Sequence, residues 1–340
     1  MVSVAAQVRG RLVQQPIHKA RQVGMGLGVA GKGVGQSLPL KDNPFAGVHQ
    51  VRYTAHGHAG LQVAQAVAHD MGAVQNNAQA LTNCIAAIRE AGAVPAITAV
   101  IDGVARVGIN ESEHERILGP AKKVGEREIA LAVAQRWSVG ATTVSASLLL
   151  ASRAGIGVFA TGGIGGVHRD SHLHGDISAD LGALAAHPVV TVCAGAKSFL
   201  DLPRTLEYLE TLGVPVVGVG CNDFPAFTVH SSGLPIPARV ENVEELCAYT
   251  QAHLALGRTS GILACVPVPL ADSLDKNMID AVIETALRAT AEAGIVGPGV
   301  TPHVLGAIAA ATGGASVVAN LSLARNNASV AAQLAVALTR

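Results

Sequence analysis

Short apolar strands and helical segments alternate along this chain from about residue 76 to its end. Residues 93–103 (AVPAITAVIDG) have the pattern of a buried strand and a turn, and residues 156–163 (IGVFATGG) that of a buried strand running into glycines. Residues 77–92 and 142–155 have helical patterns. This alternation predicts an α/β fold whose mostly parallel sheet is covered on both faces. Ligands of such folds bind beyond the carboxyl ends of the strands.

The first 75 residues differ in composition from the rest. They contain only two acidic residues, Asp42 and Asp70, and the first glutamate of the chain is Glu90. Three interpretations stay open: an organelle transit peptide, a disordered segment, or out-of-frame translation of GC-rich DNA. We therefore predict an atypical segment at residues 1–75 and a regular domain at residues 76–340.

The composition excludes some partners and compartments. The formal net charge is zero and aromatic residues make up 3% of the chain, which argues against nucleic acid as a partner. No apolar run reaches the ~18 residues of a membrane helix, so we expect no membrane span. The five cysteines form no CxxC pair, which favours reduced thiols in the cytoplasm.

Residues 159–170 (FATGGIGGVHRD) carry a glycine loop at a predicted strand end. Thr161 precedes four glycines, and His168 and Arg169 follow them. Glycines let backbone N–H groups turn toward an anion, so a phosphate site is the favoured interpretation. The alternative is a tight turn that only packing requires.

Residues 168–180 (HRDSHLHGDISAD) hold three histidines and three aspartates. We favour Asp176 as an oxygen ligand of Mn²⁺ or Mg²⁺, whose other ligands would be largely water. His172 and His174 are interpreted as bystanders on a solvated loop. Farther along the chain, Asn326 and Asn327 are interpreted as helix caps.

Residues 189–197 (VVTVCAGAK) form an apolar run that ends in Lys197, and a helical pattern follows. The small residues before this lysine would leave open space around its amine, and the nearby helix N-terminus would disfavour a cation. An amine in that environment has a lowered pKa and can form a Schiff base. A lysine with a packed stem and a solvated head is an equally good interpretation.

Several motifs together resemble pseudouridine-5′-phosphate glycosidase over roughly residues 76–338. They are GATTVSAS, VFATGGIGGVHR, DISADL, VCAGAKS with LDL and TLEYLET, FPAF, and NNA. The resemblance implies an α/β/α fold, a Mn²⁺ ion in each subunit and a homotrimer. It implies an enzyme that reversibly cleaves the C–C glycosidic bond of pseudouridine 5′-phosphate to uracil and ribose 5-phosphate, and it makes residues 76–340 the catalytic domain.

The resemblance also implies roles for individual residues. Lys197 would form an imine with C1 of the ring-opened sugar phosphate, and Asp176 would bind the metal. An iminium supplies the electron sink that a C–C glycosidic bond otherwise lacks. Further substrate contacts, beside Thr161 and His168 of the glycine loop, fall on Lys123, Val144, Ser178, Ala179, Asp180 and Asn320.

Two departures from the family pattern bear on activity. The glutamate that acts as general acid falls, counting without a gap, on Val63, and the opening strand of the family is not recognisable. Loss of a positioned general acid costs ~10²–10⁴-fold in rate. The family's VHRG reads VHRD here, with Asp170 at the mouth of the site. Two alternatives therefore stay open: a C-glycosynthase of antibiotic or C-nucleoside biosynthesis that uses ribose 5-phosphate, and an inactive sugar-phosphate-binding homologue.

Overall fold

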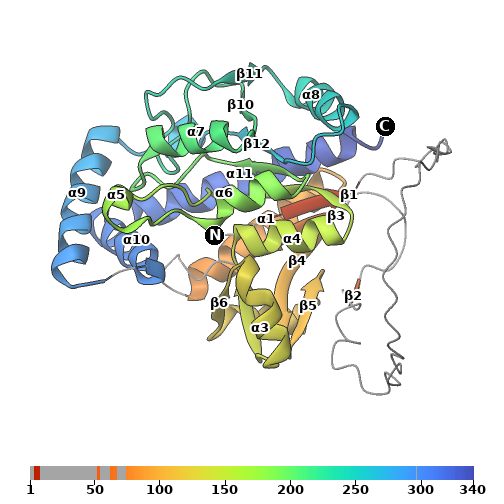
Figure 1. Ribbon diagram of the computed structural model, residues 1–340, viewed down its shortest axis with the longest axis horizontal. Helices are drawn as coiled ribbons and strands as arrows, with labels where there is room; N and C mark the ends of the chain where they lie inside the picture. Colours follow the sequence, from red (N-terminus) through yellow and green to blue (C-terminus); the bar gives the residue numbers. More distant parts are fainter. Residues whose placement is uncertain (1–3, 8–51, 54–61, 67–73, 296) are drawn as a thin grey trace, which may run out of the picture.

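The structure is a computed structural model that describes residues 4–7, 52–53, 62–66, 74–295 and 297–340 (Figure 1). Among these residues, twelve strands form one sheet with the order β11-β10-β12-β9-β8-β3-β4-β5-β2. Strand β1 adds beside β8, β7 adds beside β4, and β6 pairs with β7. The strands are β1 (Val4–Gln7), β2 (Arg52–Tyr53), β3 (Gln62–Ala66), β4 (Val94–Ile101), β5 (Val104–Val107), β6 (Lys122–Val124), β7 (Val139–Thr142), β8 (Ile156–Ala160), β9 (Val190–Cys193), β10 (Val216–Val219), β11 (Ala238–Val240) and β12 (Ile262–Cys265).

Most neighbouring strands run parallel, as the alternation of strands and helices predicts. The exceptions among the described strands are β1 against β8, and β5 and β7 against β4. The helices between the strands are α1 (Val74–Glu90), α2 (Glu111–Leu118), α3 (Ile129–Ala134), α4 (Val144–Arg153), α5 (Ser171–His174), α6 (Ala179–Ala186), α7 (Leu202–Thr211) and α8 (Val243–Ala255). Helices α9 (Lys276–Glu292), α10 (Val300–Ala311) and α11 (Ala315–Ala337) follow the last strand.

Helices cover the sheet on both faces, which confirms the three-layer α/β/α fold. In β8, Phe159 belongs to a buried cluster with α4, α6 and α7. Val158 and Ala160 point the other way, into a cluster with α1, α8 and α11. Because side chains alternate along a strand, a strand with two helical faces is apolar throughout. Figure 1 shows α11 as the long helix that passes along the sheet.

The sheet contains a strand in the region where the sequence resemblance showed none. Strand β3 lies between β8 and β4 and runs parallel to β4, with Val63 opposite Pro95. The expectation that the opening strand is missing is therefore wrong. The domain boundary near residue 75 stays a prediction, and much of the segment before it lies outside the described residues.

Within the described part of the chain, no single helix is both long and apolar enough to cross a membrane. Helices α10 and α11 pass that test only as a pair, and they are bent by 117° at their junction.

Candidate active site

Lys197 lies in the loop that follows β9, at the carboxyl end of the parallel strands. Its backbone N–H donates to the carbonyl of Ile164 at 3.2 Å, so it is tied to the loop that follows β8. The next helix, α7, begins at Leu202 with Asp201 as its N-cap. Lys197 is thus four residues before the cap, and because the helix dipole acts over about one turn, the dipole argument made from the sequence does not apply.

The small residues before Lys197 let another backbone segment of the same chain pack closely against them, so these residues leave no open space. Gly195 has a φ of +71°, and a Cβ added there would lie 2.0 Å from the carbonyl oxygen of Pro225. Ala194 and Ala196 are completely buried. Packed backbone thus fills the space at Gly195, and the room around the amine of Lys197 stays a prediction.

The imidazole of His168 is the point where several predicted site residues meet. Its Nδ1 lies 3.7 Å from Oδ2 of Asp176. Burial lowers the pKa of His168, Asp176 raises it, and the charges of Lys197 and Lys123 lower it further. The charges of Lys123 on β6 and of Lys197 in the loop after β9 thus both act on His168.

The glycine loop after β8 uses several of its backbone N–H groups within the protein. Gly165 donates to Oδ2 of Asp180 at 2.9 Å, and Val167 donates to Oγ1 of Thr205 at 3.0 Å. The N–H of Ile164 donates to a carbonyl of the loop after β9 at 3.0 Å. These three groups cannot turn toward an anion, so the interpretation of this loop as an open phosphate nest is wrong for them.

Close packing explains why this loop is rich in glycine. A Cβ on Gly163 would lie 2.7 Å from a ring carbon of Phe227, and one on Gly165 would lie 2.2 Å from Oγ of Ser178. Neither distance is one that a real Cβ can adopt without displacement of its neighbour. The alternative interpretation, a turn that packing requires, accounts for these positions.

Asp180 joins two parts of the site from a buried position. One of its oxygens accepts the N–H of Ser145 at the start of α4, and the other accepts that of Gly165. Ser178 caps α6 by accepting the N–H of Asp180 at 3.2 Å, and Ala179 is the first residue of that helix. The predicted substrate contacts of this trio stay predictions, because in this structure the carboxylate faces backbone.

The structure separates the two lysines of β6. Nζ of Lys122 lies 4.5 Å from the ring centre of Trp137, where a cation–π contact holds it. Lys123 pairs with Ala141 of β7, and its charge acts on His168. Val144 is the buried first residue of α4, and its role as a substrate contact is untested. Lys122, which is exposed, therefore has the surroundings of an ordinary surface lysine.

The sequence-based interpretation of the asparagines of α11 as helix caps is wrong. This helix runs from Ala315 to Ala337, so Asn326 and Asn327 lie in its interior. Nδ2 of Asn327 donates to the carbonyl of Thr161 at 2.8 Å. Among the described residues, Oγ1 of Thr161 and Oδ1 of Asn320 are buried polar atoms without a hydrogen-bond partner. Each can accept one further bond, and their substrate contacts stay predictions.

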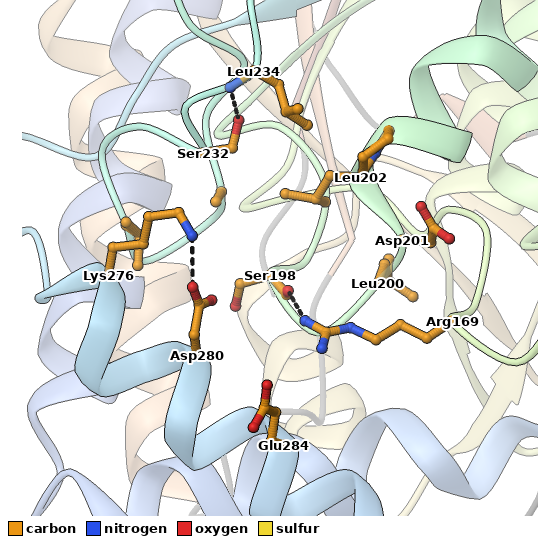
Figure 2. A pocket seen from close by; sticks show the side chains of 13 residues that line it. Arg169, Ser198, Leu200, Asp201, Leu202, Ser232, Leu234, Lys276, Asp280 and Glu284 are labelled. Atoms are coloured by element: carbon orange, nitrogen blue, oxygen red, sulfur yellow. Dashed lines mark hydrogen bonds and ion pairs between the residues drawn. The ribbon is translucent and has the colours of Figure 1, made fainter.

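A pocket of about 510 Å³ opens beside this cluster (Figure 2). Figure 2 shows Arg169 with its guanidinium beside Ser198, where Nη2 lies 3.5 Å from the carbonyl oxygen. Lys276 pairs with Asp280 across one turn of α9. Because Ser198 follows Lys197 directly, the pocket adjoins the loop that carries the lysine. The lining residues are Arg169, Ser198, Leu200, Asp201, Leu202, Pro203, Ala226, Val229, Ser232, Leu234, Lys276, Asp280 and Glu284.

The sequence did not indicate that helix α9 forms one wall of this pocket. The helix is amphipathic, and its charged residues there follow the spacing of an ordinary solvated face. Asp280 and Glu284 are four residues apart, which places them on one face of a helix. That spacing alone does not distinguish a pocket wall from a free surface.

Comparison with known proteins identifies the family. A family model described as indigoidine synthase A like protein matches residues 63–337. The chain belongs to the indigoidine synthase A-like family. Proteins named pseudouridine-5′-phosphate glycosidase are 47% identical over 268 residues in Myxococcus xanthus (78% of this chain, 88% of the relative) and 51% identical over 256 residues in Methylobacterium nodulans (74% and 75%). The resemblance found in the sequence motifs is confirmed.

Two solved structures of the indigoidine synthase A-like family share this fold. One is the prealnumycin C-glycosynthase AlnA in complex with ribulose 5-phosphate, with a TM-score of 0.71 and 37% identity over 76% of this chain and 85% of that chain. The other is an indigoidine synthase A-like protein from Thermotoga maritima, with a TM-score of 0.73 and 34% identity over 78% and 88%.

The donor set around Asp176 fits a hard cation held mainly by water. The carboxylate is 39% exposed, and His168 is the side chain beside it. His172 and His174 are exposed on α5, which agrees with their interpretation as bystanders. Within the described ranges, no three His, Cys, Asp or Glu side chains gather as a metal cage. Mn²⁺ or Mg²⁺ commonly binds through one carboxylate with water and substrate phosphate completing the shell, whereas zinc needs several protein ligands.

Proposed function

We propose that this chain is an enzyme that reversibly cleaves the C–C glycosidic bond of pseudouridine 5′-phosphate, giving uracil and ribose 5-phosphate through an imine on Lys197. The observation that carries the proposal is that the loop with Lys197 is hydrogen-bonded to the segment after β8, which also carries the pair of His168 and Asp176. Relatives 47–51% identical over about three quarters of the chain are named for that activity.

The reaction begins with the neutral amine of Lys197. Its nitrogen forms a bond to C1 of the ribose as the bond between C1 and the ring oxygen breaks, and the oxygen takes the proton that the nitrogen loses. The nitrogen lone pair then forms the protonated imine as the C1–C5 bond to the base breaks. The electron pair of that bond moves to C5 of the uracil, which takes a proton. Water hydrolyses the imine, releasing ribose 5-phosphate and the free lysine.

The residues around the lysine supply charge and orientation. The positive charge of Lys123 acts on His168, and both side chains can hydrogen-bond a sugar phosphate. Burial favours the neutral imidazole of His168, which can accept or donate a proton at a ring nitrogen. Asp180 fixes the glycine loop through the N–H of Gly165.

The proton for C5 of uracil has no assigned donor in this chain. Val63 stands at the position of the family's general acid and cannot transfer a proton. We therefore expect turnover ~10²–10⁴-fold below that of relatives that carry a glutamate there. The substitution Val63→Glu should recover activity, because it restores a carboxyl group at the position counted without a gap from the family pattern.

Three further properties follow the resemblance and are proposals. We expect Mn²⁺ at Asp176, where the bound ion would supply positive charge for the sugar phosphate. Loss of Mn²⁺ binding in Asp176→Asn, measured by titration calorimetry, tests that site. We expect a homotrimer, which light scattering tests, and a cytoplasmic location.

The deciding experiment is an intact-mass measurement after incubation with ribose 5-phosphate and borohydride, alongside uracil release from pseudouridine 5′-phosphate. An adduct that is absent in Lys197→Ala, together with uracil release, supports the glycosidase. The matched control is Lys122→Ala, because Lys122 is held by Trp137. A folded protein that forms no adduct would overturn the imine chemistry.

Two alternative functions have their own outcomes. A C-glycosynthase, favoured by the likeness to AlnA, would form the adduct and join ribose 5-phosphate to a carbon nucleophile other than uracil. A sugar-phosphate-binding homologue, favoured by the absent glutamate, would bind ribose 5-phosphate and form no adduct.

A further inference from the structure

We propose that Asn327 of helix α11 is a positioning residue for Lys197, acting through the segments that follow β8 and β9. Helix α11 packs on β8 and β9, and its Asn327 side chain is completely buried beneath the point where β8 leaves the sheet. The proposal rests on the proposed lysine chemistry. Neither the sequence motifs nor the names of the relatives give this asparagine a role.

The contacts of the Asn327 side chain are made with backbone carbonyls. Nδ2 lies 2.8 Å from the carbonyl oxygen of Thr161 and 3.3 Å from that of Gly162. Because both partners are acceptors, the amide must present its NH₂ group to them. An aspartate or a leucine of similar size could not make these two bonds at neutral pH. The amide thus fixes the first two residues after β8.

A continuous series of backbone hydrogen bonds leads from this point to Lys197. The carbonyl of Gly162 also accepts the N–H of Ala194 at 2.9 Å. The N–H of Ile164 donates to the carbonyl of Gly195 at 3.0 Å, and the carbonyl of Ile164 accepts the N–H of Lys197 at 3.2 Å. The segments that follow β8 and β9 are therefore hydrogen-bonded to each other, so a shift of the first segment moves the second.

The consequence for the chemistry is one of geometry. A covalent step needs the amine and C1 of the sugar within ~3–3.5 Å, and a displacement of ~1 Å can cost ~10²-fold in rate. Without Asn327, the carbonyl of Thr161 loses this donor and the carbonyl of Gly162 keeps only the N–H of Ala194, so the segment after β8 is held less firmly. We expect slower attack by Lys197 with little change in how the sugar phosphate binds.

The test measures the rate of borohydride trapping with ribose 5-phosphate in the parent chain, Asn327→Ala, Asn327→Asp and Asn326→Ala. Asn326 is the matched control, because its amide points to Pro267 at 3.4 Å and not to the loop. Asn327→Ala should trap at least about 10-fold more slowly, at similar half-saturation by the sugar phosphate. Asn326→Ala should stay within about two-fold of the parent.

The aspartate variant separates positioning from general loss of packing. Burial raises the pKa of a carboxyl group, and a protonated carboxyl can donate to the Thr161 carbonyl. The trapping rate of Asn327→Asp, divided by that of the parent at each pH, should rise as the pH falls from 8 to 5.5. A flat ratio, or a folded Asn327→Ala that traps at the parental rate, would overturn the proposal.

If the parent chain itself forms no adduct, the proposed function fails and amide hydrogen exchange decides the inference alone. The N–H groups of Ile164 and Lys197 should then exchange faster in Asn327→Ala than in Asn326→Ala. Equal exchange would show that Asn327 does not hold the joined loops.

Discussion

Around the ends of β8 and β9 the backbone is fixed by buried partners, whereas the pocket beside α9 is lined largely by side chains that reach solvent. In the first region, Asp180 and Asn327 lie inside the protein and bond to loop backbone. In the second, Lys276 and Asp280 pair with about half of each side chain exposed. Buried hydrogen bonds hold a geometry, and exposed ion pairs contribute little to it.

This difference shows which part of the molecule holds the candidate catalytic residues in place. The loops that carry Lys197 and His168 cannot move without breaking buried bonds or packed contacts. The pocket wall on α9 can change its side chains at low cost. Substitutions in the first region should therefore reduce stability or rate strongly, and substitutions in the second should have small effects.

The largest effect is expected for Gly195→Ala. The new Cβ would meet the Pro225 carbonyl oxygen at 2.0 Å in a backbone conformation with positive φ. Strain and overpacking together should cost about 2–5 kcal/mol of unfolding free energy. Urea denaturation measures this. Gly257→Ala is the matched control, because Gly257 has a φ of +70° with open space around it and should lose only about 1–2 kcal/mol. Equal losses would show that packing at Gly195 is not tight.

Asp180→Asn should have the next largest effect. The two backbone N–H groups would face an amide that offers one oxygen and an NH₂ group, so one charge-assisted bond is lost and a donor meets a donor. We expect a loss of about 1.5–3 kcal/mol and slower borohydride trapping. Thermal unfolding and trapping on the same sample check it. An unchanged trapping rate in the folded variant would remove Asp180 from the support of the loop.

A moderate and pH-dependent effect is expected at His168. Burial lowers its pKa below the ordinary value of 6.5, so the unfolded chain binds the proton first as the pH falls. The stability tied to the neutral imidazole is complete above pH 6.5 and is lost as the pH falls toward the folded pKa. The parent should lose more stability between pH 7 and 5 than His168→Gln, by urea denaturation. His172→Gln, at an exposed position of α5, should follow the parent.

The smallest effect is expected for Lys276→Ala on α9. The pair with Asp280 is half exposed, and such i,i+4 pairs contribute about 0.3–0.5 kcal/mol. Its removal should change the unfolding free energy by less than about 0.5 kcal/mol, and 1 M salt should abolish the difference. A loss above 1 kcal/mol would mean that the pocket wall is held as firmly as the loops after β8 and β9.

Local patterns sufficed to predict much of the fold. The helical pattern at residues 77–92 and the apolar run at 93–103 correspond to α1 and β4. Strand β3 escaped prediction because its five residues (QVAQA) carry little hydrophobic signal, and only pairing with β4 places it in the sheet.

By itself, the sequence determined the α/β class, the family and the residue types of the site, because periodicity and motifs are local properties of the chain. Tertiary structure alone decided what those residues face. It turned the N–H groups of the glycine loop inward and placed Asn327 beside the carbonyl groups that follow β8. These contacts join residues from 15 to 166 positions apart, and their partners depend on how helices pack across the sheet, which no local pattern records.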